Sequence, residues 1–359
     1  MRREPAGRLP RLRRAPAAPS ASPGRLPQIV EPMLAVAGGD PFDSPAHVFE
    51  VLWDGVRAVA FVEGGRVRLQ DGFGRDVTTR YPELGALAAS ASGGKGSGLA
   101  IDGVIVALDA NGVPDIARLL RRAAVEDAAE AARLAAEVPV SFQAFDLLYR
   151  DGRAVMSLPL RRRKELLREV LRPGGAVGLP DHVANDGLAF FEAARLHGLE
   201  GIIAKEWDSR YVPGQRTRAW LKLKVYQKDE FVIGGFTYGG QWRGVRPPPK
   251  RRRPPFASLL LGLFDASGAL QYAGEATGGF EAVSGDEAAV RALDQIVAPG
   301  CPFAREPSLG RLVSWCRPEL AATVRFGGWT PEGTLRFPVF EALRPDVPTA
   351  SCRLDWARE

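Results

Sequence analysis

Short blocks of apolar residues alternate with polar and turn-forming residues along most of the chain, and most blocks have the length of a β-strand. Residues 101–108 are almost continuously apolar, which is typical of a strand buried on both faces, and residues 140–149 also read as a buried strand. Between the strands, apolar residues recur with helical spacing. The predicted strands in this part are residues 48–53, 58–62, 67–69, 101–108, 140–149, 201–205 and 220–225. The predicted helices are residues 81–84, 114–137, 158–171 and 186–197.

From residue 230 onward the pattern changes to short strands separated by turns, which suits a small β-barrel carrying one helix. The strands expected there are residues 231–235, 258–264 and 270–274, with a helix at 286–297. Residues 247–255 form a basic, proline-rich loop that cannot pair in a sheet. We therefore expect a first domain at residues 29–227, a barrel domain at 228–350 and a tail at 351–359.

Residues 1–28 contain seven arginines and one acidic residue, Glu4, and their prolines oppose a helix, so we predict a disordered basic arm. The arm could grip phosphates, act as a solvated tail, or come from an over-extended start of translation. The whole chain of 359 residues has a formal net charge of +6, which is compatible with a polyanionic partner. Only seven residues are lysines, so each lysine is worth locating.

Three cysteines and three histidines lack the spacing of a metal site, and the cysteines are too few for a disulfide scaffold. No apolar run approaches the roughly 20 residues that span a membrane, and no signal peptide is visible. We therefore expect a cytoplasmic protein with no membrane partner.

Residues 49–58 read Phe-Glu-Val-Leu-Trp-Asp-Gly-Val-Arg-Ala, and this stretch resembles the nucleotide-attachment motif of ATP-dependent DNA ligases, a strand running into Lys-x-Asp-Gly-x-Arg. Trp53, Asp54 and Arg57 fit the nucleotide-binding part of that motif, but Leu52 fills the lysine position. In the family the lysine amine attacks the α-phosphorus of ATP and carries AMP. A leucine side chain has no lone pair and cannot form this covalent intermediate.

Six separated stretches, together covering about residues 30–350, follow the order of motifs in the bacterial end-joining type of these ligases. Residues 71–78 resemble the family's arginine-containing loop on the DNA side of the site, with Gly72 at the arginine position and Arg75 as a candidate substitute. At the family's Asp-Gly-Glu motif the chain has Asp102, Gly103 and Val104. The family glutamate supports a metal ion, whereas valine offers no oxygen to Mg²⁺.

The remaining first-domain motifs are intact. The resemblance implies that Phe145 stacks on adenine, that Glu200 helps to bind metal and that Lys205 contacts the nucleotide phosphates; a core aromatic is the alternative for Phe145. Lys222 and Lys224 lie on one face of a strand by the two-residue period. Two neighbouring ammonium groups suit a triphosphate, although a solvated edge strand would look the same.

The last family motif, Arg-x-Asp-Lys, orients the pyrophosphate of ATP, and here Arg344 and Asp346 are followed by Val347 instead of lysine. The basic loop around Arg251 and Arg252 is a candidate DNA contact. Leu52, Val104 and Val347 thus each replace a charged catalytic group with an aliphatic one.

The resemblance implies an α+β fold, with a nucleotidyltransferase (ATP-grasp-like adenylation) domain followed by an OB-fold β-barrel. It also implies ATP and Mg²⁺ as cofactors and nicked or broken duplex DNA as partner, in repair at the nucleoid. End-binding repair proteins or a catalytic ligase paralogue are further candidate partners. Three hypotheses about activity stay open: a DNA-binding protein unable to adenylate itself, an active ligase with unusual residues, and an enzyme that seals already adenylated DNA.

Overall fold

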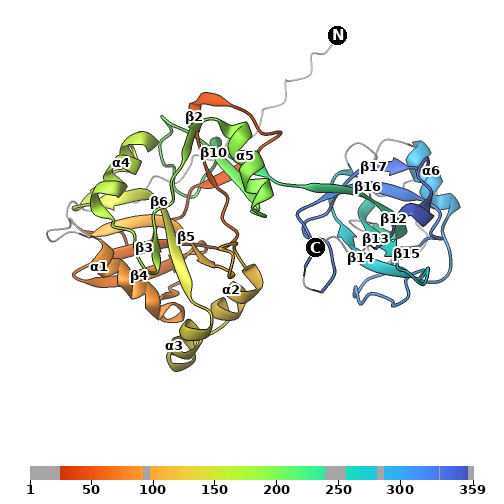
Figure 1. The fold of residues 1–359 in the computed structure, drawn as a ribbon, viewed down its shortest axis with the longest axis horizontal. Helices are drawn as coiled ribbons and strands as arrows, with labels where there is room; N and C mark the ends of the chain where they lie inside the picture. Colours follow the sequence, from red (N-terminus) through yellow and green to blue (C-terminus); the bar gives the residue numbers. More distant parts are fainter. Residues whose placement is uncertain (1–24, 92–97, 239–255, 281–286, 331, 355–359) are drawn as a thin grey trace, which may run out of the picture. The chain divides into compact units, whose positions relative to one another are not determined.

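The computed structural model describes residues 25–91, 98–238, 256–280, 287–330 and 332–354. The chain divides into two compact units, Met1–Lys224 and Val225–Glu359 (Figure 1). The first strand of the second unit, β12, begins at Gln227. Among the described residues, no helix combines the length and the apolar character that a membrane crossing requires.

The first unit contains two sheets that lie face to face. Sheet A has the strand order β1-β11-β10-β2-β9 and sheet B the order β4-β3-β5-β6-β7, with β8 paired to β6. The strands of sheet A are β1 (Leu34–Ala37), β2 (Ser44–Val51), β9 (Val183–Asn185), β10 (Gly201–Glu206) and β11 (Arg216–Lys224). Those of sheet B are β3 (Val56–Glu63), β4 (Arg66–Asp71), β5 (Leu99–Ala107), β6 (Val140–Arg150), β7 (Arg153–Ala154) and β8 (Val177–Gly178).

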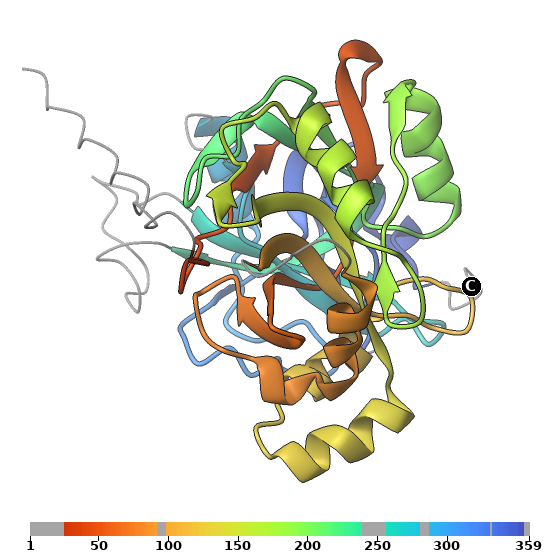
Figure 2. The same cartoon turned by 90° about the vertical axis from the view of Figure 1, so that its left-hand side faces the viewer.

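Helices cover the outer face of each sheet. α5 (Gly187–Leu196) packs on sheet A through a cluster that includes Phe49, Ala194 and Ile202, and Figure 2 shows α5 (green) beside β2 (red). The outer face of sheet B is covered by short helices whose buried side chains include Leu87 and Leu167. These helices are η1 (Thr78–Arg80), η2 (Pro82–Ala86), α1 (Leu87–Ser90), α2 (Ile116–Ala123), α3 (Ala128–Glu137) and α4 (Leu160–Val170).

The position of β5 between the helices and sheet A explains why its sequence is apolar almost throughout. Ile101 and Ile105 face the helices, whereas Ala100 and Val104 face sheet A, so both sides of the strand are covered. Asp102 lies on the sheet A side with no exposed surface. A buried carboxylate requires a hydrogen-bonded or oppositely charged partner. The partners of Asp102 belong to the candidate site.

The second unit is one strongly bent sheet with the order β14-β13-β12-β16-β17, and β15 pairs with β12. Beyond the end of β14, the Gly278 carbonyl accepts a hydrogen bond from the Phe340 N–H on β17 at 3.0 Å, which brings the two edges together. Residues 352–354, predicted as part of a tail, pair with Phe264 on β13. The elements are β12 (Gln227–Tyr238), β13 (Phe256–Phe264), β14 (Leu270–Ala276), α6 (Glu287–Gln295), β15 (Ser314–Trp315), β16 (Ala321–Phe326), β17 (Val339–Arg344) and η5 (Thr349–Ser351).

Every strand and helix predicted from the sequence has a counterpart, but the prediction of one helix at residues 114–137 is wrong. Two helices, α2 and α3, occupy this segment and are separated by residues 124–127. Asp127 adopts an extended conformation and its carboxylate accepts a hydrogen bond from the Glu130 N–H at 2.9 Å, so it caps the start of α3. The cap therefore starts a second helix within a segment where apolar periodicity alone predicted one continuous helix.

Candidate functional site

One face of sheet A gathers the motif residues of the first unit. Ile203 on β10 pairs with Glu50 on one side and with Lys222 on the other, and Lys205 pairs with Val48 and Trp220. Directly paired residues project to the same face of a sheet. The opposite face carries Phe49, Ile202, Ala204 and Leu223 under α5, so the motif residues face sheet B.

Leu52 directly follows β2, and its side chain is almost fully buried at 9% exposure. Its N–H donates to the Gly201 carbonyl at 3.0 Å, which continues the pairing with β10 beyond the strand. Trp53 and Asp54 are half-buried in the turn to β3. At Gly55 an added Cβ would lie 2.4 Å from the carbonyl oxygen of Ile105, so only glycine allows this close approach.

Glu50, two residues before Leu52, is paired with two lysines. Its carboxylate oxygens lie 2.8 Å from the Nζ of Lys164 on α4 and 2.8 Å from the Nζ of Lys205. Burial alone would raise the pKa of Glu50, but the two ammonium groups outweigh it and lower that pKa to about 2. Burial lowers the pKa of Lys205 to about 8, although Glu50 opposes the shift. In this structure the Lys205 ammonium is therefore ion-paired with the Glu50 carboxylate.

Phe145, the expected adenine-stacking residue, projects from β6 into the space between the sheets and is 7% exposed. The Lys205 Nζ lies 4.0 Å from its ring centroid and the Arg57 guanidinium carbon 4.6 Å. Trp220 contacts the same ring edge to face, at 6.2 Å between centroids. Cations and an aromatic neighbour therefore cover Phe145, and stacking on adenine would require one of them to move.

Arg57 on β3 provides the partner of the buried Asp102. The guanidinium donates two hydrogen bonds of 2.6 Å to the carboxylate, and the Tyr211 hydroxyl donates a third at 2.7 Å. Burial opposes the charge on Arg57, but Asp102 overcomes this and raises the pKa of Arg57. Burial, followed by the negative charge of Asp102, raises the pKa of Tyr211 well above its ordinary value. Arg57 is thus fixed beside Phe145 as a permanent cation.

Lys222 and Lys224 lie farther along the same face, on β11. The Lys224 Nζ is 2.5 Å from the Glu200 carboxylate. Lys222 is exposed, and partial desolvation, together with the positive charges of Lys224 and Arg57, lowers its pKa against the opposing effect of Glu200. An anion near Lys222 would relieve this repulsion, so the cation group fits a phosphate.

The same face does not fit the Mg²⁺ ion that the family motifs imply. Val104 packs against the apolar cluster that also includes Ile203, and Glu200 is already paired with Lys224. Throughout the described part of the chain, no three His, Cys, Asp or Glu side chains come together as a metal cluster. Hard cations such as Mg²⁺ need several oxygen ligands, and the side chain of Val104 supplies no oxygen.

Arg75, the candidate substitute for the family arginine, is paired with Asp71 four residues earlier, at 2.7 Å. Its side chain is 64% exposed and extends toward the ring of Phe73. Gly72, at the arginine position itself, lies next to Arg57, because an added Cβ would be 3.8 Å from the Arg57 Cβ. This loop therefore lies at the rim of the candidate site.

Arg344 and Asp346 belong to the second unit. The Arg344 guanidinium donates to both Asp346 oxygens, the shortest contact being 2.8 Å, and also to Glu230 at 2.8 Å. Val347 packs against the core of this unit. Arg251 and Arg252, predicted to contact DNA, lie outside the described residues.

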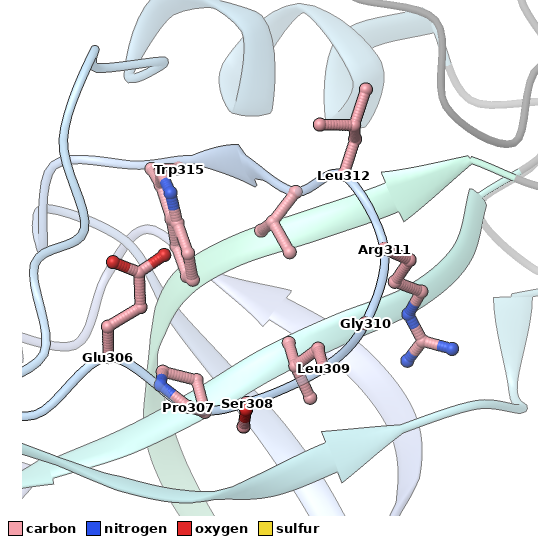
Figure 3. Close-up of a pocket in the computed structure, with 9 residues that line it drawn as sticks. Glu306, Pro307, Ser308, Leu309, Gly310, Arg311, Leu312 and Trp315 are labelled. Atoms are coloured by element: carbon pink, nitrogen blue, oxygen red, sulfur yellow. The ribbon is translucent and has the colours of Figure 1, made fainter.

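A pocket of about 400 Å³ also lies in the second unit, lined by residues 306–313 and Trp315. Figure 3 shows the loop curving around the pocket, with Trp315 at its wall and Arg311 on the opposite side. Arg311 is ion-paired with Glu275. None of the predicted nucleotide, DNA or metal site residues within the described part of the chain lines this pocket.

Comparison with protein families decides the class of protein that carries this site. Residues 32–224 match the model of the ATP dependent DNA ligase domain, and residues 252–347 match that of the ATP dependent DNA ligase C terminal region. The chain belongs to the ATP-dependent DNA ligase family. The predicted fold class, an α+β nucleotidyltransferase domain followed by an OB-fold, is confirmed.

Among relatives of this ligase-family chain are multifunctional non-homologous end joining proteins. The Mycobacterium tuberculosis DNA repair protein LigD is 36% identical over 329 residues, which cover 88% of this chain and 38% of the relative. The Pseudomonas aeruginosa LigD is 32% identical over 358 residues, covering 95% of this chain and 39% of the relative. The chain therefore spans less than two-fifths of these relatives, and the predicted resemblance to bacterial end-joining ligases is confirmed.

Solved structures agree with this assignment. A mycobacterial DNA ligase D complexed with ATP and MES is 32% identical, with 91% of this chain and 98% of that chain covered and a TM-score of 0.50. A Lig E DNA ligase, at 17% identity and a TM-score of 0.53 over 87% of this chain and 99% of that one, supports the fold alone.

Sequence reasoning missed Glu50, Lys164 and Tyr211 as members of this ligase-type site. Glu50 could have been noticed, because it lies two residues before Leu52 and shares its strand face by the period of two. Lys164 is one of only seven lysines but carries no motif of its own. Tyr211 lies in the segment between β10 and β11, and nothing in the sequence connects it to Asp102.

Proposed function

We propose that this ligase-family chain acts on nicked or broken duplex DNA in end-joining repair and does not adenylate itself. The observation that carries the proposal is the leucine at position 52, where the family has its nucleophilic lysine. The chain would then be a pseudoenzyme of the cytoplasmic nucleoid, working beside end-binding repair proteins or a catalytic ligase paralogue.

The lysines that face sheet B from sheet A, together with Lys164 on α4, support the proposal because most of them are already paired. Lys164 and Lys205 share the buried Glu50, and Lys224 is paired with Glu200. A protonated, ion-paired amine has no free lone pair with which to attack phosphorus. Lys222 is the exposed lysine of this face, so it is the residue to test as a stand-in nucleophile.

The second support is the absence of a metal carboxylate at position 104. In the family, ATP and Mg²⁺ are used together, and the metal would stabilise the charge that develops on the phosphates. Val104 offers no oxygen, and Glu200 would have to leave Lys224 before it could bind an ion. Lys222, Lys224 and Arg57 could still bind the phosphates of a nucleotide or of adenylated DNA without transferring AMP.

The test is intact-protein mass spectrometry after incubation with ATP and Mg²⁺. We expect the wild-type chain to keep its mass, with no gain of one AMP. An adduct mapped to Lys222 and lost in Lys222→Arg would overturn the proposal and establish an active ligase with an unusual nucleophile. An adduct mapped to any other lysine would overturn it as well.

A second candidate function, sealing of DNA that already carries a 5′-adenylate, is favoured by the cation group of Lys222, Lys224 and Arg57. This reaction needs no lysine nucleophile, because the 3′-hydroxyl attacks the 5′-phosphate and AMP leaves, but it still needs a metal ion. A pre-adenylated nicked duplex, incubated with the protein and Mg²⁺ in the absence of ATP, measures it directly. A sealed strand would support this function, and an unchanged nick would leave DNA binding as the proposed activity.

A further inference from the structure

Phe73 is 87% exposed, more than any other large hydrophobic side chain among the described residues. Single exposed apolar residues are common on protein surfaces and need no function by themselves. Phe73 differs from such residues because hydrogen bonds fix its loop and because the loop borders the candidate site. It is the central residue of a loop formed by residues 71–75, called here the Phe73 loop.

Asp71 fixes this loop. Its carboxylate accepts the N–H groups of Phe73 and Arg75, each at 2.9 Å, and the Nε of Arg75 at 2.7 Å. Burial opposes ionisation of Asp71, but these hydrogen bonds prevail and lower its pKa. Gly74 has a φ of +85°, which an L side chain rarely adopts. The exposed ring is therefore presented by an ordered turn.

The Phe73 loop borders the candidate site. Gly72 lies beside Arg57, which in turn contacts the ring of Phe145. On its other side the loop approaches Ile29, since a Cβ at Gly74 would be 3.8 Å from the Ile29 Cγ2. DNA that reached the candidate site would therefore pass next to Phe73.

An arginine lies beside Phe73. The Arg75 guanidinium carbon is 5.2 Å from the Phe73 ring centroid, and Arg75 is ion-paired with Asp71. Arg68 donates a hydrogen bond to the Gln28 carbonyl at 2.7 Å. The buried Gln70 side chain accepts a hydrogen bond from the Val30 N–H and donates one to the Val30 carbonyl. The chain that follows the arginine-rich arm is thus fastened along β4, next to the loop.

We propose that Phe73 stacks on an unpaired nucleobase at a DNA end; this rests on the proposed function as a DNA-binding protein. Every base has a π-face, and aromatic rings beside cationic residues are the usual platform for unpaired nucleic acid strands. Arg75 would lie beside a phosphate of the same strand. A stable protein partner would need an extended surface, whereas among the described residues of this region the exposed large apolar side chains are Phe73 and Ile29.

The experiment measures the affinity of the full chain for two DNA duplexes of equal phosphate number, one with a short unpaired overhang and one with capped ends. Phe73→Ala, Phe73→Leu and Phe73→Trp are compared with wild type at one salt concentration. Stacking contributes enough that its loss should weaken binding to the overhang by about tenfold. Because Phe73 is exposed, these substitutions should leave the fold intact.

We expect Phe73→Ala and Phe73→Leu to lose affinity for the overhang only, and Phe73→Trp to retain it. Equal losses on both duplexes, or a leucine variant that binds like wild type, would overturn stacking in favour of a simple apolar contact. Unchanged binding in Phe73→Ala overturns the inference while leaving the proposed function standing. A wild-type chain that binds neither duplex overturns both.

Discussion

Glu50 on β2 and Lys205 on β10 form an ion pair with 2.8 Å between Oε2 and Nζ, although the lysine is only 1% exposed. Lys164 approaches the other carboxylate oxygen from α4 at the same distance. One carboxylate therefore serves two ammonium groups in the interior, where an unpaired charge is costly. This cluster places one carboxylate and two ammonium groups in the interior of the first unit.

Replacing Glu50 by glutamine should destabilise the first unit strongly. Two buried ammonium groups would lose their shared counter-ion, and breaking such a buried pair typically costs about 3–5 kcal/mol. Urea unfolding measures the change. Glu192→Gln is the matched control, because Glu192 forms an exposed pair with Arg195 on α5, and its loss should not change stability measurably. Equal effects of the two substitutions would contradict the role given to Glu50.

The lowered pKa of Lys205 predicts how stability depends on pH. Between its folded value of about 8 and the ordinary value of 10.5, the unfolded chain binds more protons at this residue than the folded chain. The contribution of Lys205 to the free energy of unfolding should therefore rise with pH across this window, by at most about 3 kcal/mol. Below pH 8 the unfavourable burial of the charge is fully present.

Lys205→Met isolates this contribution, since both proteins share every other titrating group. The difference in unfolding free energy, wild type minus variant, should increase from pH 8 to pH 10.5. A difference that stays constant over this range would show that Lys205 titrates normally in the folded chain.

Restoring the missing catalytic groups should recover chemistry in steps. Leu52→Lys supplies an amine, but no carboxylate for Mg²⁺ is present at position 104, so we expect little adenylation from it alone. The double variant Leu52→Lys, Val104→Glu should form a detectable AMP adduct, and nick sealing should need Val347→Lys as well. Mass spectrometry and a nick-sealing gel measure the two steps.

Val104→Glu alone is the control for this series, because it introduces a carboxylate into the apolar cluster without a nucleophile. It should be less stable than wild type and form no adduct. A folded triple variant that neither binds ATP nor gains AMP would show that the nucleotide pocket itself is lost. The intact-looking residues from Glu200 to Lys224 would then be structural only.

DNA binding should weaken steeply with added salt, because arginines of the arm and of the loop near Arg251 displace counterions from the phosphates. Deleting residues 1–24 should flatten the plot of log affinity against log salt. A variant with the arm's arginines changed to glutamine keeps the chain length and should behave like the deletion. An affinity that does not change with salt concentration would show that these segments do not contact DNA phosphates.

The sequence predicted the strands of both units well because each strand has a face or a pair of faces to bury. The prediction of one helix at residues 114–137 was wrong because the helical spacing of apolar residues continues through residues 124–127, where the helix is interrupted. Asp127, followed three residues later by Glu130, is a recognisable helix start, and this local signal would have divided the segment correctly.

For the candidate site, the two-residue period correctly put Lys222 and Lys224 on one strand face. The pairing of Glu50 with Lys205 was not predictable in the same way, because the two residues are 155 positions apart and meet only through the β2–β10 register. The role given to Phe145 came from family resemblance, which says nothing of the Lys205 and Arg57 cations that cover its ring.

The hydrogen bond from the Leu52 N–H to the Gly201 carbonyl has an evolutionary consequence. Position 52 is held by its main chain, and its side chain is packed as leucine at 9% exposure, so folding does not depend on a lysine there. Selection for folding alone would not keep a lysine at this position. Only selection for the chemistry of that lysine would do so.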